Sequence, residues 1–311
     1  MKIGVVGTFI RDKIFPWKGE QVESIGGSYF NVSYLANLAE PETEICPVAC
    51  VGADFYEQLV DQIKSYKNLR LNGIKRVADR NTQVNLYYTG PQDRYEVTSA
   101  PMPPLGKDEM SILEDADAVL VNLITGTDVE LSALQEFRKN SNALIYLDFH
   151  SYALGIDEQG RRYYRRPNDW RDWVALVDVL QLNEMEARTL AGFSSDLPNE
   201  TLTEFGKQIL EMGPDVCHIT LGQEGTYLFY CNDDQARVKE FEALPVSDVV
   251  DIIGCGDAFA AGYLMHYFFH HDVEAATEFG IEVAGINCTF MGSSGIDEIR
   301  RVLRKRRKNL H

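Results

Sequence analysis

The sequence predicts an α/β fold: a doubly wound, mostly parallel sheet flanked by helices. Short apolar stretches of the β type alternate along most of the chain with stretches of helical periodicity, and this alternation is typical of parallel sheets. Several apolar stretches are nearly continuous, as expected of strands that are buried on both faces. After about residue 256 the pattern is helical only. We expect a single domain over residues 1–311.

The expected strands and helices follow one another in a regular order. Strands are predicted at 3–6, 45–51, 118–121, 143–147, 177–182 and 216–221. Helices are predicted at 27–39, 54–66, 128–140, 168–176, 183–191, 199–212, 258–269, 273–290 and 296–309. The stretch 258–269 is apolar almost all round, which indicates a buried helix.

The segment 81–99 breaks this order. Residues alternate between polar and apolar with period two up to Tyr88, then Gly90 and Pro91 indicate a turn, and a second alternating run follows. This pattern predicts a β-hairpin that projects from the main sheet. We therefore expect a small β lid, formed mainly by 81–99 with part of 9–25.

Bulk composition excludes several classes of protein. A formal net charge of −17 disfavours nucleic acid as a partner. No stretch approaches 18 consecutive apolar residues, so no membrane span is expected. The start of the chain lacks the features of a secretory signal, and we expect a cytoplasmic protein. The six cysteines form no CxxC pair and are predicted to be reduced thiols, most of them in the core.

The strongest chemical signal lies between Asp251 and Asp257. Gly254 and Gly256 bracket Cys255, and Asp257 follows where the buried helix is expected to begin. Backbone N–H groups at a helix N-terminus bind anions. A carboxylate at that place suits a general base that acts on the group attacking a phosphoryl. Alternatively, Asp257 is simply the N-cap of the helix; this segment alone leaves both interpretations open.

Two further segments follow predicted strands. Asn183 and Glu186 open a helix at the edge of the sheet where open α/β folds bind ligands, although the same pair also fits a capping box. Thr220, Gly222 and Gly225 follow the next strand. A lone Gly-x-x-Gly segment is more typical of an ordinary turn.

Taken together, these segments resemble the ribokinase-like (PfkB) carbohydrate kinases in order and spacing. The matching motifs are Asn183-x-x-Glu186, Thr220-Leu-Gly222-x-x-Gly225, Asp251-x-x-Gly254-x-Gly256-Asp257 and Gly26-Gly27-x-x-x-Asn31, with Asp12 upstream. The resemblance runs from Gly7 to about Gly292. It implies an ATP-dependent kinase that phosphorylates a hydroxyl of a sugar or sugar-like small molecule, with Mg²⁺ and, in members that bind a monovalent cation, K⁺.

The resemblance also implies roles for the matching residues. Asp257 would be the general base, and the backbone N–H groups of Gly254, Cys255 and Gly256 would form the anion hole. Residues of the ATP site would be Asn183, Glu186, Thr220, Gly222 and Gly225, with Glu186 holding Mg²⁺ through water. Substrate hydroxyls would be bound by Asp12, Gly26, Gly27 and Asn31. A monovalent cation would be bound by Asp251 and the carbonyl of Ile253.

Three of the departures from the family pattern concern the substrate site. Ile10, Ser28 and Ile124 stand where the family often has polar or charged contacts. They predict a substrate site less polar than a ribose site, and free ribose is not expected as a substrate. A loop with arginines between 161 and 166 is interpreted either as a phosphate contact or as a solvated basic loop.

Two alternatives to a sugar kinase share the expected fold. One is a vitamin-type kinase for a pyridoxal or hydroxymethylpyrimidine alcohol, and the other is a non-catalytic sugar or nucleotide sensor. Asp257 disfavours the sensor, which needs no base, and Asp12 with the Gly26-Gly27-x-x-x-Asn31 motif favours the sugar-kinase branch. Family members often form homodimers through their lids, and a short lid leaves that assembly open here.

Overall fold

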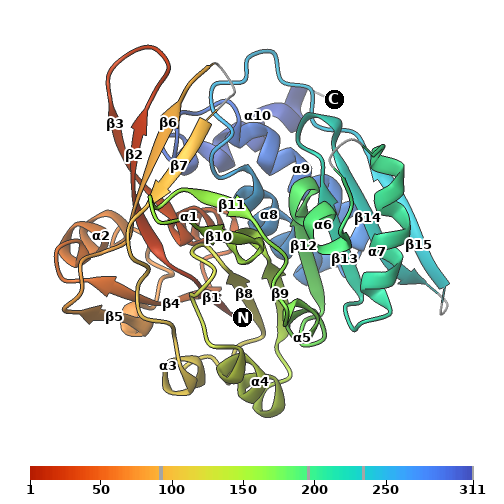
Figure 1. The fold of residues 1–311 in the computed structure, drawn as a ribbon, viewed down its shortest axis with the longest axis horizontal. Coiled ribbons are helices and arrows are strands. Elements are labelled where there is room, and N and C mark those ends of the chain that lie inside the picture. The colour runs from red at the N-terminus through yellow and green to blue at the C-terminus, as the bar shows by residue number, and fades with distance from the viewer. Residues whose placement is uncertain (91–93, 195–196, 233–234, 310–311) are drawn as a thin grey trace.

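The computed structural model describes residues 1–90, 94–194, 197–232 and 235–309. Its main sheet contains β1 (Lys2–Val6), β4 (Glu44–Gly52), β5 (Ile74–Val77), β8 (Ala118–Asn122), β9 (Leu144–Asp148), β12 (Val179–Asn183), β13 (Val216–Thr220), β14 (Thr226–Asn232) and β15 (Gln235–Phe241). The spatial order is β15-β14-β13-β12-β9-β8-β1-β4-β5 (Figure 1). Strands β13 to β5 pair in parallel, and only β14 and β15 are antiparallel. The predicted fold class is confirmed.

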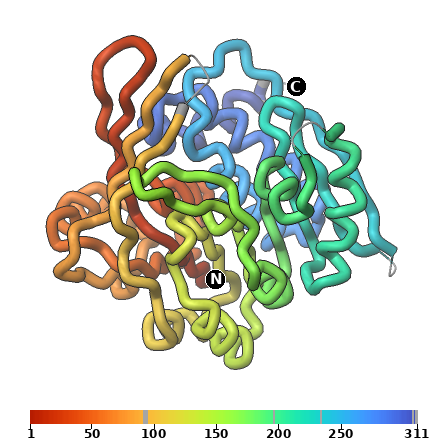
Figure 2. The backbone as a smooth tube through the Cα atoms, viewed as in Figure 1, coloured from red at the N-terminus to blue at the C-terminus, as the bar shows by residue number. Residues whose placement is uncertain are grey.

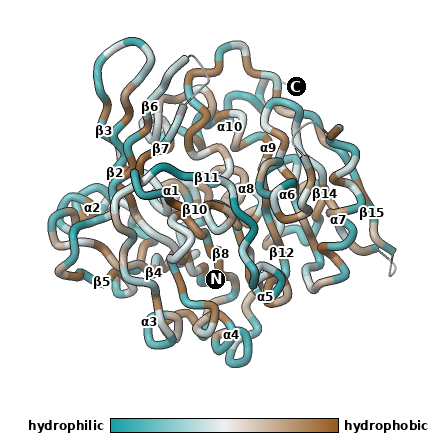
Figure 3. Tube along the Cα trace, in the orientation of Figure 1, coloured by the Kyte–Doolittle hydropathy of each residue, from teal (hydrophilic) through white to brown (hydrophobic). Residues whose placement is uncertain are grey.

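Helices cover both faces of this sheet. One face packs against α1 (Ser28–Leu38), α2 (Tyr56–Ile63), α8 (Cys255–His270), α9 (Val273–Asn287) and α10 (Ile299–Asn309). The other packs against α3 (Lys107–Ser111), α4 (Leu131–Asn140), α5 (Trp170–Val174), α6 (Glu184–Ala191) and α7 (Leu202–Leu210). Figure 3 shows hydrophobic colouring along the central strand β8, whose side chains alternate between the two cores. Within the described part of the chain, no helix is long and apolar enough to cross a membrane.

A second, four-stranded sheet projects from one end of the main sheet (Figure 2). It has the order β3-β2-β6-β7 and contains β2 (Phe9–Phe15), β3 (Val22–Gly27), β6 (Gln83–Tyr88) and β7 (Arg94–Thr98). We call it the lid sheet. The N-terminal segment contributes as many strands to the lid sheet as the hairpin at 81–99 does. The turn of that hairpin, residues 91–93, lies outside the described residues.

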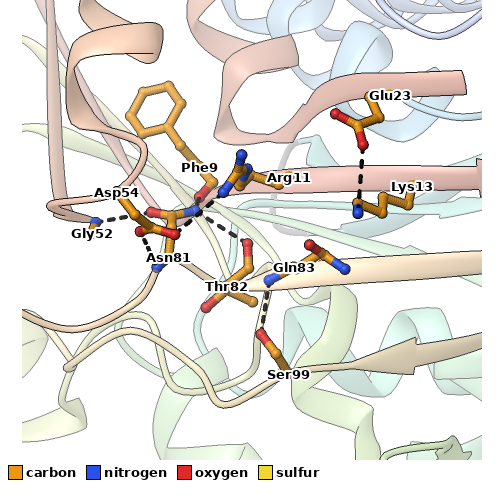
Figure 4. A network of polar contacts seen from close by, with 10 residues as sticks. All are labelled: Phe9, Arg11, Lys13, Glu23, Gly52, Asp54, Asn81, Thr82, Gln83 and Ser99. Carbon is orange, nitrogen blue, oxygen red and sulfur yellow. Dashed lines mark hydrogen bonds and ion pairs between the residues drawn. The ribbon is translucent and has the colours of Figure 1, made fainter.

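Asn81 joins the root of the lid sheet to the end of β4 (Figure 4). Its Nδ2 donates to the carbonyl of Phe9 over 2.8 Å and to that of Thr82 over 3.1 Å. Its Oδ1 accepts from the N–H of Gly52 over 3.0 Å, and its own N–H donates to Asp54 over 2.8 Å. Asn81 therefore links the start of β2 and the segment before β6 to the end of β4.

A small hairpin of β10 (Leu154–Ile156) and β11 (Arg162–Tyr164) lies against the free edge of the lid sheet. The N–H of Thr98 donates to the carbonyl of Gly160 over 3.0 Å, and Val97 forms a β-bridge with Arg161. This is the segment with the arginines, and its hydrophilic character is visible around β11 in Figure 3. The hairpin extends the wall that the lid sheet forms.

Candidate active site

Parallel pairing brings polar residues together at one edge of the main sheet. Strands β8, β9, β12 and β13 end at the same edge, where Asn122 pairs with Asp148, Asp148 with Gln181, and Asn183 with Thr220. A cavity of about 240 Å³ opens there. It is lined by this edge, by the start of α8 and by the inner face of the lid sheet.

The start of α8 requires glycine. Gly254 is the N-cap residue and has a φ of 76°, in the left-handed region that side chains disfavour. A Cβ atom at this position would also lie 2.4 Å from the ring of Phe30. The first N–H groups of a helix have no partner within it, and Gly254, Cys255 and Gly256 at this end of α8 line the cavity. The N–H of Cys255 donates a long hydrogen bond, 3.4 Å, to the carbonyl of Ile252.

Asp257 lies in the first turn of α8 and is 7% exposed. Its Oδ1 accepts a 2.7 Å hydrogen bond from Nδ2 of Asn122. Because Gly254 is the N-cap residue, the interpretation of Asp257 as the helix cap is wrong. Burial raises the pKa of Asp257 to about 7, while hydrogen bonds from Asn122 and Asn31 act to lower the pKa. A buried carboxyl with a pKa near neutrality is suited to general-base catalysis.

Asn122 supports the base from behind, fully buried and outside the cavity lining, and the sequence reasoning missed it. Its Nδ2 also donates to Oδ1 of Asn31 over 2.8 Å, and Nδ2 of Asn31 donates to the carbonyl of Asp257 over 3.2 Å. Asn31 was expected to bind substrate, but it lies behind the base, fully buried and outside the cavity lining. A polar residue at the end of an otherwise apolar strand was the available signal for Asn122.

Two more carboxylates lie beside the base. Oδ2 of Asp148 accepts from Nε2 of Gln181 over 3.2 Å, and the same nitrogen donates to the carbonyl of Gly256. Burial, together with the charges of Glu186 and Asp257, raises the pKa of Asp148 well above its usual value. Burial likewise raises the pKa of Glu186. Without a cation beside them, both carboxyls therefore favour their protonated forms.

Asn183 and Glu186 form the capping box that the sequence allowed. The N–H of Glu186 donates to Oδ1 of Asn183, and Oε2 of Glu186 accepts from the N–H of Asn183, each over 2.9 Å. Both residues nevertheless line the cavity, so capping does not exclude a ligand-binding role.

Oxygen donors at this edge fit a hard divalent cation such as Mg²⁺. Asp148 and Glu186 are the candidates for its ligands, since both line the cavity at this edge. Among the described residues, no cluster of three or more His, Cys, Asp or Glu side chains can hold a metal ion. Mg²⁺ would accordingly keep water or phosphate oxygens as its other ligands, as it usually does.

The remaining predicted residues fall into three groups. Asp12, Gly27 and Thr220 line the cavity, and Gly26 packs so closely on Asp12 that a Cβ atom would lie 1.8 Å from Oδ2. Gly222 and Gly225 lie in the turn between β13 and β14, outside the cavity lining. The third group is the loop before α8: the two carboxylate oxygens of Asp251 accept from the N–H groups of Ile253 and Gly292, and the carbonyl of Ile253 accepts from Asn287.

The lid end of the cavity combines apolar residues with one ion pair. Its apolar residues are Ile10, Val84, Leu86 and Ile124. An Nη atom of Arg162 lies 3.5 Å from Oε2 of Glu96, and the Arg162 side chain is only 9% exposed. Arg162 also donates to Oγ of Ser151 over 2.6 Å. The interpretation of this segment as a solvated basic loop is therefore wrong for Arg162, which lines the cavity.

A profile described as the pfkB family carbohydrate kinase matches residues 17–299. The chain belongs to this family. The kinase is similar to the cytidine kinase of Thermococcus kodakarensis, with 25% identity over 87% of this chain and 90% of the relative. It is also similar to the nucleoside kinase of Methanothermobacter thermautotrophicus, with 24% identity over 83% of this chain and 76% of the relative.

The fold of the kinase is that of solved ribokinase-like structures. It superposes on a ribokinase from Giardia lamblia with a TM-score of 0.78 at 18% identity, covering 98% of both chains. An adenosine kinase from Sinorhizobium meliloti gives a TM-score of 0.76 at 15% identity, again covering 98% of both chains. The predicted resemblance is confirmed, and the chain is an ATP-dependent phosphotransferase of the pfkB family.

Proposed function

We propose that the kinase transfers the γ-phosphoryl group of ATP to a hydroxyl of a sugar-like acceptor, with Asp257 as the general base. One observation supports this assignment above the others. The buried carboxyl of Asp257 shares a single cavity with the N–H groups at the start of α8, with the edge residues Asn183, Glu186 and Thr220, and with the lid sheet. ATP at the edge of the main sheet and the acceptor molecule near the lid sheet would thus both lie next to the base.

The proposed chemistry follows from the position of Asp257. Asn122 holds Oδ1 of Asp257, so Oδ2 is the oxygen that takes the proton from the acceptor hydroxyl. The hydroxyl oxygen then attacks the γ-phosphorus, the bond to the bridging oxygen of ADP breaks, and Asp257 is left protonated. The N–H groups of Gly254, Cys255 and Gly256 would hold the negative charge of the transferring phosphoryl, as preorganised donors do in phosphoryl transfer.

A divalent cation would be held by Glu186 and Asp148. When bound, it would neutralise phosphate charge during transfer. Its presence would also favour the ionised forms of both carboxyls, whose pKa values burial raises. We also propose that Asp251 and the carbonyl of Ile253 would bind a monovalent cation. Comparing turnover in K⁺ with turnover in Na⁺ tests this directly.

The acceptor end favours a molecule with both hydroxyls and an apolar part. Asp12 is a hydrogen-bond acceptor for hydroxyls, and the apolar residues Ile10, Val84 and Ile124 lie on the same side of the cavity. A nucleoside has both features, and two relatives are named as a cytidine kinase and a nucleoside kinase. We therefore propose nucleosides as the first class of acceptor to test.

A screen for ADP release tests the proposal. Purified protein would be assayed with ATP and Mg²⁺ against nucleosides, neutral sugars, keto-deoxy acids and amino sugars, with and without K⁺. We expect turnover of at least one nucleoside and far less with free ribose. Turnover of ribose equal to that of the best acceptor would contradict the proposed acceptor site. Absence of ATP and ADP binding in a calorimetric titration at millimolar Mg²⁺ would contradict the kinase proposal itself.

A further inference from the structure

We propose that Cys255 and Cys288 are an oxidisable pair, whose intramolecular disulfide disables the anion hole. Their Sγ atoms lie 3.1 Å apart, although 33 residues separate them in the chain. A disulfide has an S–S distance of about 2 Å, so the two sulfurs need to approach by only about 1 Å. The expectation that Cys255 is simply a reduced core thiol overlooked this neighbour, because no sequence spacing places the two cysteines together.

Contacts other than the one between the two sulfurs hold the pair in place. Cys255 is the first residue of α8, and Cys288 directly follows α9. Nδ2 of Asn287 donates to the carbonyl of Ile253 over 2.8 Å and lies 3.3 Å from Sγ of Cys255. The carbonyl of Cys288 accepts from the N–H of Val250 over 2.8 Å. The loop before α8 is therefore already tied to the end of α9, which favours closure of the S–S bond.

An oxidant has a route to this pair. Cys255 lines the cavity of the active site, and both cysteines are partly exposed. Cys46, Cys50 and Cys217 are buried. A molecule as small as hydrogen peroxide can enter where a nucleotide would bind, so a bound nucleotide should protect Cys255.

The chemistry balances with hydrogen peroxide as the oxidant. The sulfur of one of the two cysteines attacks one peroxide oxygen, the O–O bond breaks, and one water leaves as a sulfenic acid forms. The sulfur of the other cysteine then displaces the hydroxyl as a second water, and the S–S bond forms. Two thiols thus lose two protons and two electrons to one peroxide, and a dithiol such as dithiothreitol reverses the reaction.

The expected consequence is loss of phosphoryl transfer. The N–H of Cys255 belongs to the proposed anion hole, and we expect closure of the S–S bond to shift the backbone of this residue, by up to about 1 Å, and so to misplace that donor. A misplacement of this size lowers rates by about 10²-fold. The disulfide itself does not depend on the proposed kinase reaction, so the two ideas can fail separately.

A peptide map tests the disulfide without any acceptor. Reduced protein would be treated with hydrogen peroxide, alkylated with iodoacetamide and cleaved before aspartate, which separates residues 251–256 from residues 272–296. We expect a disulfide to join these two peptides within one chain. It should form more slowly when Mg²⁺ and ADP are present. The linked peptide should disappear in Cys288→Ser and persist in Cys231→Ser, which removes an exposed thiol elsewhere.

Two results would overturn the proposal. The first is complete oxidation of the exposed Cys231 while Cys255 and Cys288 remain thiols that iodoacetamide alkylates. Linkage of Cys255 to Cys288 only between two molecules would count against the proposal in the same way. The second is unchanged turnover in fully linked protein, since we expect a loss of about 10²-fold that dithiothreitol restores. Wild-type protein suffices for both measurements, so a poorly folded Cys288→Ser does not leave the question open.

Discussion

Replacing Asp257 by Asn isolates the role of its carboxylate. The side chain keeps its size and loses the proton acceptor, so turnover should fall by about 10²–10⁴-fold. Nucleotide affinity should hold or rise, because a negative charge near the phosphates is removed. Calorimetry with ADP and the ADP-release assay measure the two effects. Normal turnover in Asp257→Asn would remove the base from the mechanism.

Thermal melting at pH 8 supplies a control for that substitution. The folded-state pKa of about 7 lies above the ordinary value of 3.8, so ionising the buried carboxyl destabilises the folded protein as the pH rises through 7. Asp257→Asn should therefore melt at the same temperature or higher at pH 8. A large fall in melting temperature would instead assign Asp257 a structural role.

The activity should also depend on pH through Asp257. The base is active only when ionised, so kcat/KM should fall about tenfold per pH unit below about 7, where Asp257 takes up its proton. Asn122→Ala removes the hydrogen bond that favours the ionised form, and the fall should begin at a higher pH. An acidic limb at the same pH in wild type and Asn122→Ala would show that another group controls it.

At the level of single residues, the sequence predicted which residues are candidates for the site better than it predicted which residues contact one another. Asp257 and Glu186 were found because their motifs are local in the chain, and both line the cavity. Asn122 and Arg162 were not assigned to the site. Their roles depend on partners far away in sequence, such as the 135 residues between Asn122 and Asp257, which a local pattern does not reveal.

Among the elements, the root of the lid sheet is held chiefly by Asn81. Asn81→Ala leaves the N–H of Gly52 and the carbonyl of Phe9 without this partner, and unsatisfied buried groups cost about 1–3 kcal/mol each. Urea denaturation should show a loss of this order. Because β2 carries Asp12, the KM for the acceptor should rise more than the KM for ATP.

Asn85→Ala is the matched control for the lid. Asn85 lies on β6 of the same sheet and accepts a hydrogen bond from the side chain of Gln83. Its substitution should change stability and both KM values little. Equal effects of the two substitutions would show that the lid root has no special role.

The main-sheet strands that were predicted are continuous apolar runs, and the lid strands β6 and β7 were predicted from alternation. β14, which reads TYLFYCN, was missed although its first four residues are buried. The six strands predicted from apolar runs all lie within the main sheet. The edge strand β15 is mostly exposed and reads QARVKEF, without the apolar run that indicates burial. β5 has only four residues. Edge strands are stabilised by pairing with a neighbouring strand, and their own sequence carries little signal of that pairing.

For the whole molecule, the doubly wound architecture was predictable because burial on two faces imposes a strong sequence pattern. Val119 and Leu120 illustrate it: successive residues of β8 pack into opposite cores. The lid sheet was predicted in position but not in its number of strands. Its β2 and β3 depend on pairing with each other and with β6, and the short segment between Phe9 and Gly27 carries little independent signal.

The charge of the whole molecule makes a prediction about nucleotide entry. The formal net charge is −17, and five carboxyl residues line the cavity, Asp12, Glu96, Asp148, Glu186 and Asp257. A nucleotide without Mg²⁺ is a polyanion and should be repelled on approach. Salt screens such repulsion, with a Debye length that falls from about 30 Å at 0.01 M to about 10 Å at 0.1 M.

The association rate of a fluorescent ADP derivative without Mg²⁺ should accordingly rise with salt, several-fold between about 0.01 M and 0.1 M. Stopped-flow mixing measures it. With Mg²⁺ present the nucleotide carries less charge, and the dependence should weaken; neutral fluorescent adenosine should show none. A rate that falls with salt would mean that local donors at the start of α8, together with Arg162, create a positive potential at the cavity that outweighs the charge of the rest of the molecule.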